Sequence, residues 1–236
     1  MQNSIHNQIR DRIERLPDGS VFVIADFSDL ADQKTISKTL TRLCSAGYSE
    51  KVLRGVFWKP SKSLNDDDSL FDFDEYEDSN IEIEIIEDSD SYDGDDGPNP
   101  DSVARALARN YLWKLVPTGD TAKHLLGLDE NVPEKWTYIT DGAYHEYRYG
   151  NNIISFQHAS SRFTSSMSEA TAMLVQVIKS YGKDSIPASV IEKIKIMYKK
   201  YDWSAIIEES RNTTEWIASL IRKMFRSDNK KAQSAN

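Results

Sequence analysis

One segment of the chain, residues 65–98, constrains its folding more than any other feature. It holds sixteen Asp or Glu side chains and no Lys or Arg in 34 residues. Charge runs of this kind are usually disordered and often act as interaction tails, although Ile81, Ile83 and Ile85 alternate with glutamates as in a half-buried strand. The remaining 22 acidic residues face 29 Lys and Arg, a net charge of +7. The sequence therefore predicts a mildly basic protein that carries a polyanionic insertion.

Composition and pattern predict an α+β protein in three parts. We expect an N-terminal winged helix-turn-helix over residues 1–62, an acidic insertion or linker over 63–99, and a C-terminal α/β domain over 100–236 that ends in a helical, bundle-like tail. The one cysteine, Cys44, excludes an intramolecular disulfide and a Cys-x-x-Cys metal site. No secretory signal and no apolar run of about 18 residues is found, so we expect a soluble, cytoplasmic protein.

The first sixty residues follow the order of elements in a winged helix-turn-helix. Isoleucines at helical spacing predict a first helix that ends at Pro17, and an apolar run predicts a strand over residues 21–25. Ser28 can cap a short helix, and Asp32 can cap the next one. Gly47 is the residue type that ends helices, so it sets the end of this third helix.

A hairpin with its turn at Arg54-Gly55 is predicted to follow as the wing, and we expect Lys51 and Arg54 at its tip. In such folds the last helix contacts base edges, and the wing meets the phosphate backbone. No acidic residue lies between Gln33 and Ala46, although a solvated helix face is the simpler alternative. The candidate DNA-binding residues lie on the outer face of the third helix and on the hairpin: Gln33, Lys34, Thr35, Ser37, Lys38, Arg42, Lys51 and Arg54.

Beyond residue 100 the pattern alternates between helices and strands before it becomes helical. We expect Asp101 to cap a helix over 102–110, a strand over 111–116, and a second helix capped by Asp120. Gly150-Asn151 predicts a second hairpin. The remainder predicts four helices, over 167–181, 188–201, 203–209 and 213–225.

Catalytic motifs are absent from the sequence. It contains no GxxxxGK[ST] loop, no GxSxG elbow and no HExxH. No two of its four histidines stand three or four residues apart, so helical metal-ligand spacing is missing. Asp141, His145 and Glu146 could form an acid–base site, but polar residues at a strand–turn junction are the commoner explanation. We therefore expect no enzyme activity, no cofactor and no bound metal.

The acidic insertion suggests a second type of interaction. Its aspartates do not follow the spacing of a calcium-binding loop, so a metal site is not predicted. A tethered polyanion can engage a basic protein partner or imitate nucleic acid, and a plain solvated linker is the alternative. The candidate partner-binding residues are Asp66, Asp67, Asp68, Asp72, Asp74, Glu75, Glu77, Asp78, Glu82 and Glu84.

Several segments, taken together, resemble one known family. Thr35–Leu43, Gly47 and Arg54–Trp58 are similar to the N-terminal winged helix of AbiEi-type antitoxins, which belong to type IV toxin–antitoxin systems. The order and spacing of the segments are more specific than any one alone, and the resemblance covers roughly residues 3 to 60 and 100 to 182. Further similar segments lie in the second region: Val103–Arg109, Val116–Gly119, Ala122–Leu128, Val132-Pro133, Tyr138–Gly142 and Ile153–His158.

The resemblance implies two roles in a bacterial abortive-infection system for phage defence. The winged helix would bind operator DNA in the operon's own promoter and act as a transcriptional repressor. The C-terminal region would neutralise a nucleotidyltransferase-like toxin of the AbiEii type. Two alternatives stay open, a protein-interaction module that works through the acidic insertion and a stand-alone transcriptional regulator. The insertion itself departs from the family, whose members usually join the two domains by a short connection.

Overall fold

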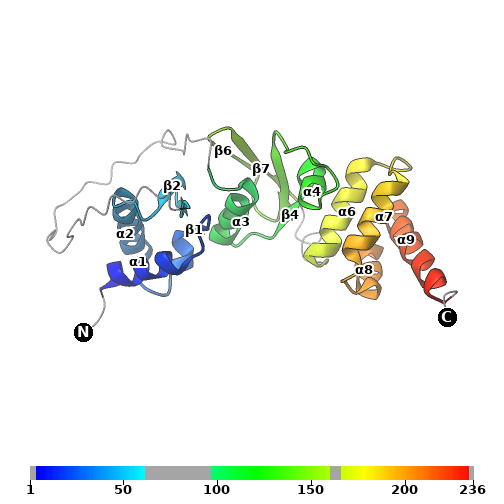
Figure 1. Cartoon of the computed structure of the whole chain (residues 1–236), viewed down its shortest axis with the longest axis horizontal. Helices are drawn as coiled ribbons and strands as arrows, with labels where there is room; N and C mark the ends of the chain where they lie inside the picture. The colour runs from blue at the N-terminus through cyan, green and yellow to red at the C-terminus, as the bar shows by residue number, and fades with distance from the viewer. Residues whose placement is uncertain (1–3, 62–96, 160–165, 234–236) are drawn as a thin grey trace. The chain divides into compact units, whose positions relative to one another are not determined.

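The computed structural model describes residues 4–61, 97–159 and 166–233, with side chains as far as Phe225. The chain divides into two compact units, Met1–Asn110 with Arg148–Asn151, and Tyr111–Tyr147 with Asn152–Asn236. Helices and two small β-sheets make it an α+β protein, as predicted (Figure 1). All ten acidic residues predicted to bind a partner fall in 62–96, outside the described residues. The domain boundaries predicted at 62 and 99 lie at or near the ends of these undescribed residues, 62–96, and no finding tests them.

The described residues of the first unit form three α-helices, one 3-10 helix and a three-stranded sheet. The sheet is antiparallel throughout, with strand order β1-β3-β2. Ile9 and Ile13 pack with Leu40, Leu43 and Phe57 in a buried core. The elements are α1 (Ile5–Arg15), β1 (Val21–Val23), η1 (Ile24–Phe27), α2 (Gln33–Ser45), β2 (Glu50–Leu53), β3 (Val56–Trp58) and α3 (Pro100–Tyr111).

The ends of α2 agree with the prediction. The Asp32 carboxylate accepts hydrogen bonds from the backbone N–H of Lys34 (3.0 Å) and Thr35 (3.1 Å), which is the geometry of an N-cap. At the other end Gly47 has φ +78° and donates to the Cys44 carbonyl, while Tyr48 donates to the Leu43 carbonyl. This pair of bonds closes the helix as a Schellman motif does.

Ser28 does not cap the short helix, so that prediction was wrong. The helix is the 3-10 turn η1, and Ser28 follows its last residue. The cause is Asp26, whose carboxylate accepts a hydrogen bond from the Val23 backbone N–H at 2.9 Å. This contact ends the strand at Val23, two residues earlier than predicted, and folds the following residues into a tight turn.

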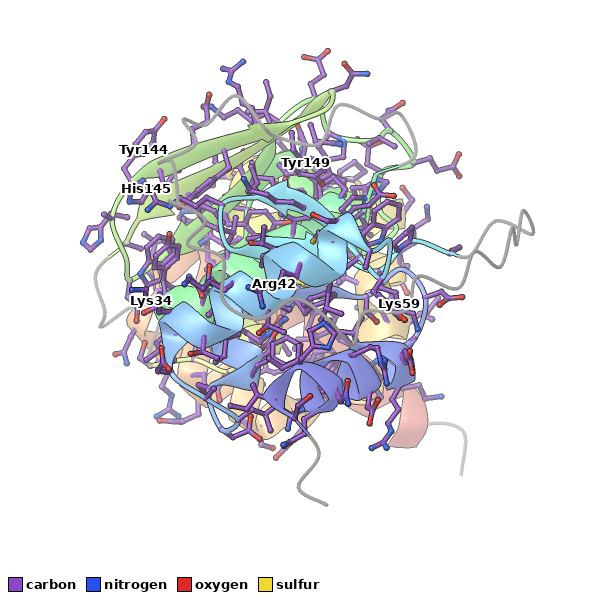
Figure 2. All side chains as sticks on the ribbon, turned by 90° about the vertical axis from the view of Figure 1, so that its left-hand side faces the viewer. Lys34, Arg42, Lys59, Tyr144, His145 and Tyr149 are labelled. Carbon is purple, nitrogen blue, oxygen red and sulfur yellow. The ribbon has the colours of Figure 1, made fainter. Side chains whose placement is uncertain are left out.

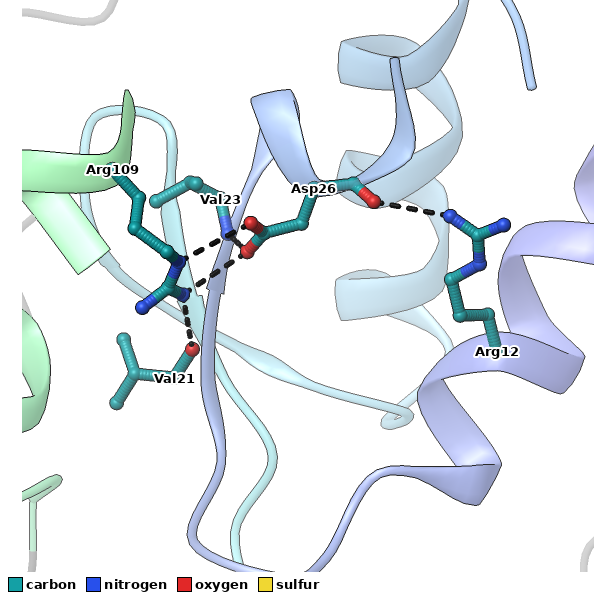
Figure 3. A network of polar contacts seen from close by, with 5 residues as sticks. All are labelled: Arg12, Val21, Val23, Asp26 and Arg109. Atoms are coloured by element: carbon teal, nitrogen blue, oxygen red, sulfur yellow. Dashed lines mark hydrogen bonds and ion pairs between the residues drawn. The ribbon is translucent and has the colours of Figure 1, made fainter. Parts of the chain in front are cut away.

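Asp26 also joins η1 to two helices (Figure 3). Arg109 on α3 donates to its carboxylate through Nε (3.3 Å) and Nη2 (3.2 Å), and Nη2 also donates to the Val21 carbonyl (3.2 Å). Arg12 on α1 donates to the backbone carbonyl of Asp26 at 3.1 Å. Three segments that are distant in sequence therefore meet at one residue.

The start of α3 differs from the prediction. Asn99, and not Asp101, caps the helix, because the Asn99 side-chain oxygen accepts from the Asp101 backbone N–H at 2.9 Å. Pro100 then occupies the first helical position, where a missing N–H has no cost. Asp101 instead pairs with Arg105 one turn along the helix (2.8 Å). Just before the helix, the Tyr149 hydroxyl donates to the buried Pro98 carbonyl at 2.9 Å, and burial raises the pKa of Tyr149.

The described residues beyond α3 form a four-stranded sheet and a group of helices. The strand order is β4-β5-β7-β6; β4 runs antiparallel to β5, whereas β5 and β7 are parallel. The predicted hairpin at Gly150-Asn151 joins β6 to β7. The elements are β4 (Leu115–Pro117), α4 (Gly119–Leu125), β5 (Trp136–Thr140), β6 (His145–Tyr149), β7 (Asn152–His158), α6 (Glu169–Tyr181), α7 (Ala188–Tyr198), α8 (Trp203–Glu209), η2 (Ser210–Asn212) and α9 (Glu215–Gln233).

Helices α6, α7, α8 and α9 pack side by side, as the predicted helical tail requires (Figure 1). Apolar side chains from all four, among them Leu174, Ile194, Ile206 and Ile221, form one buried cluster that also takes in Ala122 of α4. Because these helices bury a continuous core, they form a folded part of the unit. No helix in the described ranges has the length and apolar content needed to cross a bilayer.

Two further predictions in this unit were wrong. The strand expected over 111–116 begins only at Leu115, because α3 continues to Tyr111 and Leu112 turns the chain with φ +57°. Thr118, and not Asp120, occupies the N-cap position of α4, and its hydroxyl bonds to Gln176 (3.0 Å). Asp120 instead accepts from Lys123 (3.0 Å).

Gly142, after β5, is fixed by the indole ring of Trp113. A Cβ atom at residue 142 would overlap the indole atoms Cε2, Nε1 and Cδ2. The loop backbone therefore lies directly against the ring. This contact gives a physical reason for glycine in the Asp141-Gly142 turn that does not depend on a positive φ.

Replacing Gly142 with alanine should destabilise the protein by about 1–3 kcal/mol, the usual cost of overpacking a tight contact. Urea unfolding followed by circular dichroism measures the change. Ala143→Ser, at the exposed neighbouring position, serves as the control and should leave the midpoint unchanged. An unchanged midpoint for Gly142→Ala would show that the loop and Trp113 separate without cost.

Candidate nucleic-acid interface

The three cationic side chains of α2 form an exposed row. Lys34, Lys38 and Arg42 stand four residues apart, so they lie on one face of the helix. All three are exposed, and none forms an ion pair with a residue in the described ranges. Figure 2 looks onto this helix, with Lys34 and Arg42 labelled. We call these three side chains the α2 basic row.

Other cations of the same unit are used by the fold. Arg12 of α1 binds the Asp29 carboxylate through two nitrogens, each at 2.7 Å. Lys59, also labelled in Figure 2, donates to the carbonyls of Glu14 (2.9 Å) and Leu16 (2.7 Å), where it satisfies the end of α1. The α2 basic row differs from these residues because, among the described residues, its charged groups form no ion pair and cap no helix end.

Some polar side chains of α2 are bonded to their own helix or its cap, and others face solvent. The hydroxyl of Thr35 donates to Asp32 (2.7 Å), and that of Thr41 donates to the Ser37 carbonyl (3.0 Å). The hydroxyl proton of Thr35 is thus already engaged, and a ligand would meet the hydroxyl as an acceptor. Gln33 is exposed, and the side chain of Ser37 is half-buried. The helix therefore presents mainly cations and amide or hydroxyl groups to solvent.

The hairpin places the two predicted wing residues differently. Arg54 is exposed in the turn between β2 and β3, beside Gly55, whose φ of +76° suits a tight turn. Lys51 lies within β2, paired with Phe57, and not at the tip as predicted. Lys51 is half-buried, and its charge counteracts part of the rise in pKa that burial causes in the Cys44 thiol. Arg54 is therefore the better placed of the two to meet a phosphate.

The proposed acid–base cluster does not come together as a site. Asp141 accepts a hydrogen bond from the Lys114 backbone N–H (2.8 Å), and Glu146 pairs with Lys135 (2.5 Å). His145 stacks on Trp113, with ring centroids 5.8 Å apart. Each of the three groups thus contacts a different partner. Across the described ranges, no three His, Cys, Asp or Glu side chains group closely enough to hold a metal ion.

The sequence reasoning missed a surface at the end of α3. Tyr111, Leu112 and Tyr144 are exposed there, beside the stacked rings of Trp113 and His145. The density of aromatic residues at 111–113 and 144–149 was a usable signal. The sequence predicts a strand over 111–116 and a hairpin at Gly150-Asn151 for these residues, and neither prediction says that the side chains are exposed.

The fold and surface define an α+β protein with a basic helix face in its first unit and a sheet-and-helix second unit. Residues 82–206 match DUF6088, described as a family of unknown function. The match covers more than half of the chain, and the protein belongs to the DUF6088 family. It begins within the acidic segment and ends in α8, so it leaves out the residues that form α1 to β3. No curated protein matches the chain.

Asp32 sets the first turn of α2 and therefore the position of the α2 basic row. Its hydrogen bond with the Thr35 side chain, followed by the bond from the Thr35 backbone, lowers the pKa of Asp32 below its ordinary value of 3.8. A carboxyl group with a depressed pKa stabilises the fold above its unfolded-state pKa, and this contribution disappears as the pH falls through the folded-state pKa.

Asp32→Ala should therefore lower the thermal unfolding midpoint at pH 7, and the difference from the parent should shrink below about pH 4. Calorimetric scans between pH 7 and pH 2.5 measure it. Glu130→Ala removes an exposed carboxylate from a loop and should show no such pH-dependent difference. A deficit for Asp32→Ala that stays constant to pH 2.5 would exclude the charged cap as its cause.

Proposed function

We propose that this protein is an AbiEi-type antitoxin of a bacterial toxin–antitoxin system for phage defence. In this proposal its first unit is a winged helix-turn-helix that binds and represses its own promoter. Its C-terminal region neutralises a nucleotidyltransferase-like toxin. Both activities belong to the cytoplasm, where promoter and toxin are found. The observation that carries the proposal is the α2 basic row, set on the helix that the resemblance assigns to DNA.

The dimensions of the α2 basic row suit DNA. Residues four apart on a helix are about 6 Å apart along its axis, so Lys34 to Arg42 spans about 12 Å. This distance is comparable to the width of the B-DNA major groove, about 12 Å, which admits an α-helix. Three cations in line can meet phosphates, while Gln33 and Ser37 supply the polar groups that contact base edges.

The charge distribution supports nucleic acid over an ordinary solvated face. Solvated helix faces usually mix both signs, as α1 does with Arg10 and Glu14. Between its N-cap and its end, α2 carries no acidic residue. The β2–β3 hairpin adds the exposed Arg54, at the position where a wing meets the backbone.

Lys38→Glu should weaken binding to DNA from upstream of the protein's own gene by roughly tenfold, equivalent to about 1.4 kcal/mol. The substitution replaces a phosphate contact with repulsion, so the slope of log K against log salt should fall by about one. Fluorescence anisotropy at several salt concentrations measures both quantities.

Lys183→Glu makes the same charge change at an exposed position of the second unit and is the matched control. It should leave both the affinity and the slope near those of the parent. If Lys38→Glu and the control lose equal affinity, the effect is one of net charge, and the DNA assignment of α2 fails.

Co-expression tests the antitoxin role directly. The proposal predicts a nucleotidyltransferase-like gene beside that of this protein. Induction of that gene alone should arrest growth, and expression of the full chain should restore it. Lys38→Glu should rescue growth as well as the parent, because the proposal separates repression from neutralisation. A parent chain that never restores growth against the arresting protein would contradict the proposal.

A further inference from the structure

A line of hydroxyl side chains runs along α2 beside the α2 basic row. Ser37, Thr41 and Ser45 stand four residues apart, so they follow one line along the helix, as the three cations do. At about 3.6 residues per turn, Thr41 lies about 60° around the axis from Lys38, so the two lines share one face. We call these three residues the hydroxyl row. Thr41 and Ser45 are exposed, and Ser37 is half-buried.

The hydroxyl protons of Thr41 and Ser45 point back into the helix. The Thr41 hydroxyl donates to the Ser37 carbonyl at 3.0 Å, and the Ser45 hydroxyl donates to the Thr41 carbonyl at 3.3 Å. A carbonyl oxygen carries no proton, so the hydroxyl must be the donor in both bonds. A hydroxyl whose one proton is engaged offers a ligand only the lone pairs of its oxygen. Both exposed members of the hydroxyl row are therefore acceptors.

The two rows differ in the hydrogen bonds that they can form with a base. Lysine and arginine side chains only donate, whereas the exposed hydroxyls of α2 only accept. In the major groove, guanine O6 and N7 and thymine O4 are acceptors, and the adenine N6 and cytosine N4 amino groups are donors. The exposed hydroxyls can thus pair with the amino groups of adenine and cytosine, but with neither keto oxygen.

Thr41 is the hydroxyl residue of α2 that is best placed to meet a base. It is exposed and adjoins Arg42, whereas the hydroxyl residues earlier in the helix are half-buried or buried: Thr35, Ser37 and Thr39. Long cationic side chains can extend sideways to the phosphates of the groove walls, but the Thr41 oxygen is bonded directly to Cβ. A side chain this short meets the part of the groove that faces the helix, which is the line of base edges.

We propose that Thr41 is a specificity-determining residue of this protein, whose hydroxyl oxygen accepts a hydrogen bond from the amino group of an adenine or cytosine in the promoter. The inference rests on the function proposed above and adds base selection to it. Cations that bind phosphates give affinity for every sequence alike, whereas this hydroxyl distinguishes one base pair from another. The bond to the Ser37 carbonyl sharpens the choice, since turning the proton toward a keto oxygen would break that bond.

Threonine offers a base one other group, the Cγ2 methyl, which can contact the methyl group of thymine. Two substitutions separate these groups. Thr41→Val keeps the methyl and replaces the hydroxyl, whereas Thr41→Ser keeps the hydroxyl and removes the methyl. Because Thr41 is exposed, both variants should fold as the parent does, and thermal unfolding followed by circular dichroism checks this.

The test measures the affinity of the full chain for fluorescent DNA duplexes from upstream of its own gene. Each duplex carries one base-pair change, so the set gives the base preference at every position. At one base pair the parent should prefer adenine or cytosine by about fivefold or more, the usual cost of a mismatch. Thr41→Val should lose this preference, and Thr41→Ser should retain it. Ser219→Ala, which removes an exposed hydroxyl of α9, is the control and should bind as the parent does.

Two further measurements distinguish a base contact from a general loss of affinity. Thr41→Val should leave the salt slope unchanged because it removes no charge, whereas Lys38→Glu should lower the slope. At the base pair whose preference is lost, the amino group itself is then removed, with purine in place of adenine or pyrimidinone in place of cytosine. This change should weaken binding of the parent as much as Thr41→Val does, and it should not weaken binding of the variant further.

The outcomes separate this inference from the proposed function. If the parent binds the duplexes but Thr41→Val keeps every base preference, or if the parent tolerates loss of the amino group, the inference is overturned and the function stands. A preference that is lost in Thr41→Ser and kept in Thr41→Val would assign the contact to the methyl group and would overturn it as well. If the parent binds none of the duplexes more tightly than a scrambled sequence, the proposed DNA function fails and the inference falls with it.

Discussion

The arrangement of η1 between α1 and α3 in the first unit depends on the hydrogen bonds of Asp26. Its carboxylate fixes the Val23 N–H and receives Arg109 of α3, while its carbonyl receives Arg12 of α1. The Asp26 and Arg109 side chains are 31% and 49% exposed, and pairs this accessible contribute about 0–1 kcal/mol. The apolar contacts of Ile9, Leu40 and Phe57 supply the stability. What Asp26 contributes is position, since it sets where η1 turns.

The sequence predicted the ends of a helix correctly where the capping residue had no competing side-chain partner. Asp32 begins α2 and Gly47 ends it, as expected, so the face that carries Lys34, Lys38 and Arg42 could be located in advance. Prediction failed where polar side chains found other partners. Asp101 pairs with Arg105 and Asp120 with Lys123, so neither caps its helix. These choices depend on side-chain competition that residue type alone does not decide.

Long-range features could not be found from the pattern along the chain. Strand β5 pairs in parallel with β7, although β6 lies between them in the sequence. No residue pattern within β5 or β7 identifies the other strand as its partner. The contact of Arg109 with Asp26 joins residues 83 positions apart. The exposed Leu112 was missed for a related reason. The stacked rings and the hydrogen bond from the Lys114 N–H to Asp141 hold its backbone in the left-handed region, a conformation that leucine by itself does not favour.

The one cysteine of the chain gives its first unit a built-in reporter. Cys44 lies on the inner side of α2, against the core, with Sγ 3.2 Å from the Ser49 hydroxyl. Burial raises the pKa of the thiol, so little reactive thiolate exists at neutral pH while the helix stays in place. Because Cys44 is half-buried, its raised pKa slows alkylation of the intact protein, and local opening of α2 would speed it. A change in the alkylation rate therefore reports a change in the packing of the helix that carries the basic row, without any label being introduced.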